Sequence, residues 1–221
     1  MKNVKNIIFD FDGVILDSIP VKTEAFRKLF FSFSEDKVNE LVAFHIKNGG
    51  MSRYKKIEYF FTQILNESIT NKDVLKYAEI YSQITKEELA QKKYLIEDSL
   101  NFIKENYKNY KMHIASGADE KDLKYICYKL ELEEYFLSIN GSPKIKSEIV
   151  KDILKKNNYK KEETILIGDS IIDYKAAKKN NIEFYGYNNT SLKTYTQYLE
   201  NFRLFSEKIC LKLRGQTLKN N

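Results

Sequence analysis

The feature that most constrains this fold is a repeated alternation of helical and strand-like segments in the C-terminal half of the chain. Beginning near residue 98, amphipathic segments predict helices at 97–107, 120–132, 146–158 and 172–181. Apolar runs that follow them predict strands at 110–118, 134–142, 163–170 and 182–187. A further buried strand is predicted at 4–13, and the tail from Thr190 predicts a short strand at 201–205 and a last helix. Such alternation is typical of an α/β fold with a doubly wound parallel sheet.

Helical periodicity replaces this alternation between the first strand and the rest of the sheet. One stretch, 52–65, places its apolar residues at the spacing of a buried helix face: Ile57, Phe60, Phe61, Ile64 and Leu65. We therefore predict an all-helical cap domain at 14–97, inserted into an α/β core formed by 1–13 and 98–221. Asn48–Arg53 is predicted to be a cap loop whose paired glycines permit close approach to a ligand.

Composition and charge exclude several classes of partner. The net charge of +6 does not indicate nucleic-acid binding, because the lysines are spread along the chain and form no basic block. No run of about 18 apolar residues is present, so we expect no membrane partner. The N-terminal segment becomes charged too soon for a secretory signal, and Cys127 and Cys210 have no disulfide or metal spacing. We expect a cytoplasmic protein that is monomeric or weakly homo-oligomeric.

Polar residues gather where the predicted strands end. Ligands of open α/β sheets bind beyond the carboxyl ends of the strands, at the point where the winding direction reverses. The predicted topology brings these residues to that edge: Asp10, Asp12, Ser116, Gly117, Lys144, Asp169 and Asp173. Four separate strand ends thus supply carboxylates, a hydroxyl and an ammonium group to a single site.

Four short segments carry a resemblance to a known family. In order along the chain, "DFDGVILDS", "IASG", "SPKIK" and "GDSIID" resemble the motifs of the haloacid dehalogenase-like hydrolase superfamily. The helical segment after the first motif is similar to the cap of its phosphoglycolate phosphatase and β-phosphoglucomutase relatives. The resemblance covers nearly the whole chain, and it implies an α/β core with a helical cap and activity on phosphate esters.

The resemblance also implies roles for the carboxylates. Asp10 would attack phosphorus and form an aspartyl-phosphate, which divides one difficult displacement into two easier ones. Asp12 would protonate the leaving oxygen and then deprotonate the attacking water. Because a carboxylate repels a phosphate dianion, a cation is needed between them. The family's Mg²⁺ would be held by Asp10, the main-chain carbonyl of Asp12 and Asp169, with Asp173 as a further or supporting ligand.

The same resemblance implies a phosphate site. Ser116 and the amide of Gly117 would hold phosphoryl oxygens, and Lys144 would neutralise charge on the reacting groups. The family's lysine is usually followed by proline, whereas here Pro143 precedes Lys144, so Lys146 is an alternative for this role. Arg53 would bind a second anionic or hydroxyl group of the substrate, or simply be solvated at a helix start.

Simpler interpretations of these motifs stay open. "DFDG" also fits an Asp-Gly turn that closes a strand. Asp173 lies three residues after Ser170, which is the spacing of a helix-capping box, and it can fill this role together with metal binding. Asp17 and Ser18 lie where the predicted cap leaves the core, and we expect a hinge or helix cap there.

These observations lead to one functional hypothesis and two alternatives. The hypothesis is a Mg²⁺-dependent phosphatase that hydrolyses a small-molecule phosphate ester, with a sugar phosphate as the first expectation. The first alternative is a phosphosugar mutase of the β-phosphoglucomutase type, which returns the phosphoryl group to the sugar. The second is a non-catalytic binding module on the same fold.

Overall fold

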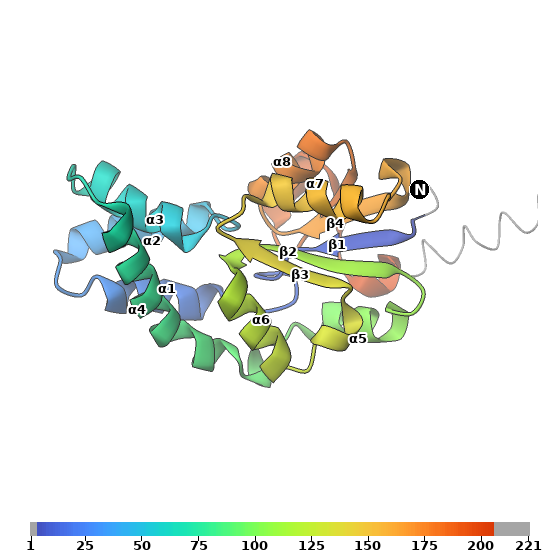
Figure 1. The fold of residues 1–221 in the computed structure, drawn as a ribbon, viewed down its shortest axis with the longest axis horizontal. Coiled ribbons are helices and arrows are strands. Elements are labelled where there is room, and N and C mark those ends of the chain that lie inside the picture. The colour runs from blue at the N-terminus through green and yellow to red at the C-terminus, as the bar shows by residue number, and fades with distance from the viewer. Residues whose placement is uncertain (1–3, 206–221) are drawn as a thin grey trace, which may run out of the picture.

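A six-stranded parallel sheet forms the centre of the molecule in the computed structural model, which describes residues 4–205 (Figure 1). Its strands are β1 (Asn6–Phe9), β2 (Lys111–Asp119), β3 (Ser138–Ser142), β4 (Thr164–Gly168), β5 (Glu183–Tyr187) and β6 (Gln197–Leu199). The strand order is β3-β2-β1-β4-β5-β6, and every neighbouring pair is parallel. The chain therefore winds outward from β1 to β3 and then crosses back to β4, so the winding direction reverses beside β1.

Helices cover both faces of this sheet. Helices α5 (Glu97–Asn106) and α6 (Glu120–Lys129) lie on one face, and α7 (Lys146–Lys156) and α8 (Ile171–Asn180) lie on the other (Figure 1). Alternate side chains of β1 point to opposite faces, so Ile7 and Phe9 pack with the α5 and α6 cluster while Ile8 packs with the α7 and α8 cluster. The predicted doubly wound α/β fold is confirmed.

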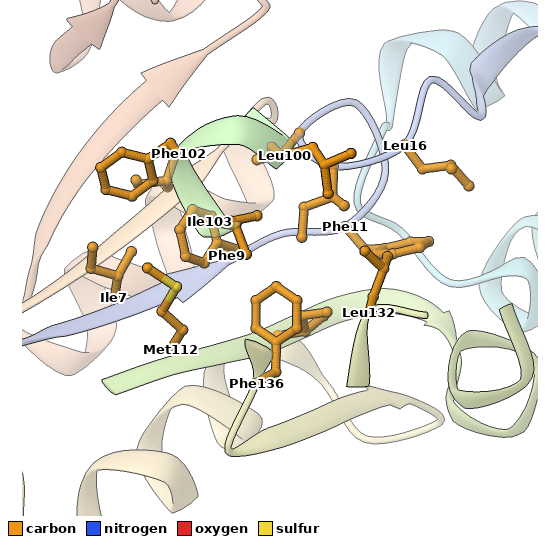
Figure 2. Close-up of a cluster of buried hydrophobic side chains, with 14 of the residues drawn as sticks. Ile7, Phe9, Phe11, Leu16, Leu100, Phe102, Ile103, Met112, Leu132 and Phe136 are labelled. Carbon is orange, nitrogen blue, oxygen red and sulfur yellow. The ribbon is translucent and has the colours of Figure 1, made fainter. Parts of the chain in front are cut away.

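An aromatic cluster fixes the end of β1 from which the first motif leaves. Figure 2 shows Phe9 and Phe11 among the buried side chains of this cluster, together with Phe102 and Phe136. The Phe9 ring lies edge-on to Phe136, with 6.1 Å between ring centroids, and 6.4 Å from Phe102. Because Phe9 and Phe11 are fully enclosed on either side of Asp10, the backbone that carries Asp10 has little freedom to move.

Four helices follow the first motif and lie beyond the end towards which the strands point (Figure 1). They are α1 (Ile19–Leu29), α2 (Glu35–Lys47), α3 (Arg53–Tyr59), which continues into a π-helical turn at Phe60–Ile64, and α4 (Asn71–Leu89). Their aromatic side chains form a separate hydrophobic cluster that includes Phe26, Phe30 and Phe60. Val14, Ile15 and Leu16 instead belong to the core cluster, so our proposed cap of 14–97 has its helical part at 19–89.

The end of the chain differs from the prediction. The strand predicted at 201–205 is wrong, because β6 lies at Gln197–Leu199 and residues 202–205 are helical. Phe202 and Phe205 are three residues apart and both buried in the core cluster, which suits one helix face. The amide of Phe202 donates to Asp98 Oδ2 at 3.0 Å. The rest of the predicted last helix lies outside the described residues.

Short 3-10 turns complete the structure at Lys92–Tyr94, Glu133–Tyr135, Lys161–Glu163 and Thr190–Thr194. Within residues 4–205, no helix has both the length and the apolar character needed to cross a bilayer.

Candidate active site

The first motif turns sharply after β1 and places Asp10 against the fourth motif. The Asp10 side chain is buried, and its Oδ1 accepts a hydrogen bond of 2.7 Å from the amide of Phe11. Gly13 has a φ of 75°, and a Cβ at this position would lie 2.1 Å from Oδ2 of Asp169. A residue with a side chain would therefore both strain this turn and displace Asp169.

Three carboxylates converge at the point where the sheet reverses its winding. Asp10 follows β1, Asp169 follows β4 and Asp173 lies in the first turn of α8, and one oxygen from each lies within 4.8 Å of the others. Oδ1 of Asp169 is buried, and no residue in 4–205 gives it a hydrogen bond. Carboxylate oxygens are the ligands that Mg²⁺ prefers, and a buried oxygen without a donor suits a cation. These residues can therefore hold a divalent metal ion.

Lys146 is the lysine that reaches this cluster. Its side chain is 2% exposed, and its Nζ lies 2.8 Å from Oδ2 of Asp10 and also contacts Oδ1 of Asp173. Lys144, which we predicted for this role, is 52% exposed and pairs with Asp152 instead. The reason is local: Lys144 lies in the loop before α7, whereas Lys146 is the first residue of that helix, at the edge of the sheet.

The electrostatics of the cluster leave an excess of negative charge. Burial raises the pKa of Asp10 well above its usual range, the charge of Asp173 adds to this, and Lys146 opposes it. Burial, followed by the charge of Asp173, raises the pKa of Asp169 to about 7. Burial lowers the pKa of Lys146, but Asp10 and Asp173 outweigh this effect and raise it, so the ammonium group stays charged. A bound divalent cation would relieve the remaining repulsion.

Asp173 forms the predicted capping box and also contacts the lysine of the site. Its Oδ2 accepts hydrogen bonds from the amide of Ser170 at 3.0 Å and from the Ser170 hydroxyl at 2.6 Å. Together with the bond from the Asp173 amide to the Ser170 hydroxyl, this forms the capping box of α8. Because Oδ1 contacts Lys146, both oxygens have partners within the protein. Asp173 thus supports the site through Lys146 and the helix start.

Asp12 lies in a different environment from Asp10. Its Oδ1 accepts a hydrogen bond of 2.6 Å from the hydroxyl of Ser18 and lies 2.5 Å from Nζ of Lys22. Burial raises the pKa of Asp12, but the charge and hydrogen bond of Lys22 outweigh it and hold this pKa below its ordinary value. We did not predict Lys22. Lys22 lies four residues after Ser18, at the start of α1, and this spacing could have indicated that both side chains lie on the same face of the helix.

The second motif lies directly beneath the cap loop. Ser116 is fully buried, and its Oγ accepts a hydrogen bond of 3.0 Å from the amide of Ala118. A Cβ on Gly117 would lie 2.2 Å from the carbonyl oxygen of Gly50, so these two backbones can approach each other only because residue 117 has no side chain. A Cβ on Gly50 would lie 2.8 Å from Oγ of Ser170. The loop that we predicted to contact a ligand therefore covers the site.

Arg53 joins the cap to the core. Its Nη2 donates to Oδ2 of Asp122 at 2.5 Å, and its Nη1 donates to Oγ of Ser82 at 2.5 Å. On the same contact surface, the hydroxyl of Tyr54 donates to Oδ2 of Asp119 at 2.5 Å. Arg53 thus links α3 to α4 and to α6, and substrate binding by Arg53 stays a prediction. The acidic residues of this contact were missed, because nothing in their local pattern indicates a distant partner.

A partly open cavity of about 70 Å³ lies between the cap and the carboxylates. The core contributes Asp12 and Asp169 to its wall, and the cap contributes Lys22, His45 and Lys56. Neither His45 nor Lys56 was predicted as a site residue from the sequence. The cavity gives a small molecule simultaneous access to the carboxylates and to basic groups of the cap.

Comparisons with known proteins agree with this geometry. The family model described as haloacid dehalogenase-like hydrolase matches residues 7–187. A phosphorylated carbohydrates phosphatase from Thermotoga maritima is 26% identical over 191 residues, which cover 80% of this chain and 82% of the relative.

Solved structures share the fold. The β-phosphoglucomutase of Clostridium difficile superposes with a TM-score of 0.75 at 19% identity, covering 95% of this chain and 99% of that one. A protein described as a predicted phosphoglycolate phosphatase from Haemophilus somnus gives a TM-score of 0.71 at 14% identity, covering 91% and 96%. At these identities the structural likeness establishes the fold alone. The family resemblance inferred from the four motifs is confirmed, and the chain belongs to the haloacid dehalogenase-like hydrolase family.

Proposed function

We propose that this protein is a Mg²⁺-dependent phosphatase that hydrolyses a small phosphorylated metabolite through an aspartyl-phosphate. The observation that carries the proposal is the contrast between two neighbouring carboxylates. Asp10 is buried beside Lys146, whereas Asp12 is bound by Ser18 and Lys22. Environments that push the pKa values of two carboxylates apart are typical of sites where they have separate chemical roles.

Asp10 is the proposed nucleophile. Its Oδ2 lies 2.8 Å from Nζ of Lys146, whose charge opposes the rise in the pKa of Asp10 that burial and Asp173 cause. A bound divalent cation would lower this pKa further, towards the ionised carboxylate that the attack requires. Attack on phosphorus forms the Asp10–phosphate bond as the bond to the leaving oxygen breaks. Ser116 and Gly117 lie at the end of β2 and would orient the phosphoryl oxygens. Lys146, in place of Lys144, would offset the charge that develops on the transferred group.

Asp12 is the proposed acid and base. An incoming phosphate dianion raises the pKa of a nearby carboxyl, so Asp12 can carry a proton for the leaving oxygen in the first step. In the second step, Asp12 would remove a proton from the water that attacks the aspartyl-phosphate. The ionised form that Lys22 stabilises in the structure is the form needed for this second step.

A metal ion fits the carboxylate cluster. Asp10, Asp169 and the main-chain carbonyl of Asp12 would hold Mg²⁺, with Asp173 in support. When bound, the ion would neutralise the carboxylate and phosphate charges that otherwise repel each other. The Asp169 oxygen that lacks a donor within residues 4–205 supports this assignment.

The cap and the relatives support a compact substrate. The cap loop lies over the second motif and lines a small cavity, so it would limit the access of bulk water to the aspartyl-phosphate. The Thermotoga maritima relative is a phosphatase of phosphorylated carbohydrates, so we propose a phosphorylated carbohydrate as the first substrate class.

Hydrolysis of p-nitrophenyl phosphate tests the proposal. We expect Asp10→Asn to lower kcat by at least 10³-fold and removal of Mg²⁺ with EDTA to abolish turnover by the wild type. Asp17→Asn is a matched control, because Asp17 belongs to the same motif but is exposed. Equal rates for the wild type and Asp10→Asn, with and without Mg²⁺, would refute the mechanism.

A second assay separates hydrolysis from the alternatives. Sugar 1-phosphates and 6-phosphates would be incubated with the protein, and inorganic phosphate and sugar phosphates would be quantified. We expect phosphate to accumulate linearly with time. Conversion of a 1-phosphate to a 6-phosphate without phosphate release would favour a mutase, and no turnover of any ester would favour a non-catalytic module.

A further inference from the structure

We propose that Lys56 and His45 form a subsite for a second anionic group of the substrate. The inference rests on the proposed function, and it narrows the substrate to a phosphorylated carbohydrate that also carries a carboxylate or a second phosphate. Both side chains come from the cap, and both line the cavity that Asp12 and Asp169 close from the core side. A single small molecule can therefore contact the carboxylate cluster and the Lys56–His45 pair at the same time.

Lys56 is a buried lysine that, in its charged form, has no acidic partner among residues 4–205. Lys56 is 4% exposed. Its Nζ lies 2.8 Å from Nδ1 of His45 and 3.5 Å from the carbonyl oxygen of His45. No carboxylate oxygen of residues 4–205 lies within 4.0 Å of this ammonium group. Buried charges are normally paired, because an unpaired ion loses its hydration without compensation. An anion from the substrate would supply the missing partner.

His45 adds a second unused donor. A charged lysine has no acceptor, so Nδ1 of His45 must accept from Lys56, and the ring proton must lie on Nε2. Nε2 is buried and has no hydrogen-bond partner among the described residues. Burial, followed by the charge of Lys56, lowers the pKa of His45 to about 3, so the ring stays neutral and keeps this arrangement. The ring is held against Phe26, with 5.0 Å between centroids.

The other charged groups around the cavity already have partners or a proposed role. Lys22 is paired with Asp12, and Arg53 is paired with Asp122. Asp169 belongs to the carboxylate cluster that can hold a metal ion. Among the described residues that line the cavity, the positive charge of Lys56 is the one left without a counter-ion. The subsite therefore selects for negative charge on the part of the substrate that lies beneath the cap.

The chemistry of this pair suits a carboxylate or a phosphate equally. Both present anionic oxygens that accept from an ammonium and from an imidazole N–H. The small cavity, about 70 Å³, favours a compact leaving group over a long one. Two pairs of substrates distinguish a carboxylate from a phosphate as the second anionic group. The first pair is 3-phosphoglycerate with glycerol 3-phosphate, and the second is fructose 1,6-bisphosphate with fructose 6-phosphate. Within each pair, the first member alone carries the second anionic group.

The test measures kcat/KM for each substrate pair. We expect the wild type to prefer at least one anionic member by tenfold or more, and Lys56→Met to reduce that preference to about twofold or less. Lys55→Met is the matched control, because the Lys55 side chain is 68% exposed, pairs with Glu58 and lies on the same helix. The control should keep the wild-type preference. Equal kcat/KM within both pairs, or the same preference in Lys56→Met as in Lys55→Met, would overturn the proposal.

A binding measurement separates this inference from the proposed function. Calorimetric titration of the Asp10→Asn protein with 3-phosphoglycerate, fructose 1,6-bisphosphate and their partners reports affinity without turnover. We expect one anionic member to bind at least tenfold more tightly, and this difference to disappear when Lys56→Met is added. If the Asp10→Asn protein gave this result while the wild type hydrolysed no ester, the phosphatase would be refuted and the subsite retained. Equal affinities within both pairs, including no detectable binding, would overturn the subsite.

Discussion

The buried ammonium group of Lys56 predicts a characteristic dependence of stability on pH. Burial, followed by the charge of Lys22, lowers the pKa of Lys56 from 10.5 to about 7, while Asp12 and Asp169 act in the opposite direction. The groups that face Lys56 are therefore Lys22, Asp12 and Asp169, with His45 in direct contact. In the unfolded chain the lysine regains its ordinary pKa, so folding and proton binding are linked.

The sign of the effect follows from where the proton is held. Below pH 7 the Lys56 side chain is charged in both the folded and the unfolded protein, and burial of this charge destabilises the folded state in full. Between about pH 7 and 10.5 the unfolded state binds a proton that the folded state has lost, so the free energy of unfolding rises with pH. A pKa difference of about 3.5, at about 1.4 kcal/mol for each pH unit, corresponds to an upper limit of about 5 kcal/mol.

The perturbation is Lys56→Met, which keeps an unbranched apolar stem and removes the charge. We expect the variant to be more stable than the wild type at pH 6, and we expect this advantage to shrink by several kcal/mol as the pH rises to 10. The free energy of unfolding is measured by urea denaturation. Circular dichroism follows the unfolding, because the chain has no tryptophan for fluorescence. EDTA is added at every pH so that metal binding does not contribute to the measured stability. Lys55→Met should differ from the wild type by a nearly constant amount, and an equally constant difference for Lys56→Met would refute the reasoning.

Three further changes test the contacts around the site. Lys146→Met should lower kcat on p-nitrophenyl phosphate by about 10² to 10³-fold, because Lys146 contacts Asp10. Lys144→Met should leave kcat within about twofold of the wild type, because Lys144 pairs with Asp152 outside the site. Gly117→Ala should lower kcat for every ester by at least tenfold without lowering Tm by more than a few degrees, since the new Cβ would block the cap loop and not the core. Asp122→Asn should leave the buried Arg53 without its close counter-charge, because Oδ1 of Asp119 lies 4.0 Å from Nη2, and should reduce the free energy of unfolding by about 3 kcal/mol in urea denaturation. An unchanged midpoint would contradict this.

The core and its motifs could be predicted from the sequence because their signals are local. Alternating apolar runs and amphipathic segments identify the strands and helices, and parallel strands end at the same edge of a sheet. The position of Asp10, Asp169 and Asp173 at this edge therefore does not depend on the cap, and in the structure the three carboxylates lie together. The predicted strand at 201–205 failed because a short apolar run fits a buried strand and a buried helix equally.

The choice between Lys144 and Lys146 shows a limit of the same reasoning. Both residues follow β3, and the sequence pattern places either near the edge of the sheet. Only the position at which α7 begins decides which ammonium group points to Asp10, and helix starts are among the least certain features of a sequence. The contact of Arg53 with Asp122 joins residues 69 positions apart, and no local pattern encodes it.

Lys55 and Lys56 show which signal was present but unused. The two lysines are adjacent, yet Lys55 is exposed beside Glu58 while Lys56 is buried against His45. The apolar spacing of this helix does distinguish them, because Lys56 lies four residues before Phe60, on the face that the cap buries. A lysine on the buried face of a helix needs a partner for its charge. Since the described residues supply no acid for Lys56, its partner is to be sought in the substrate.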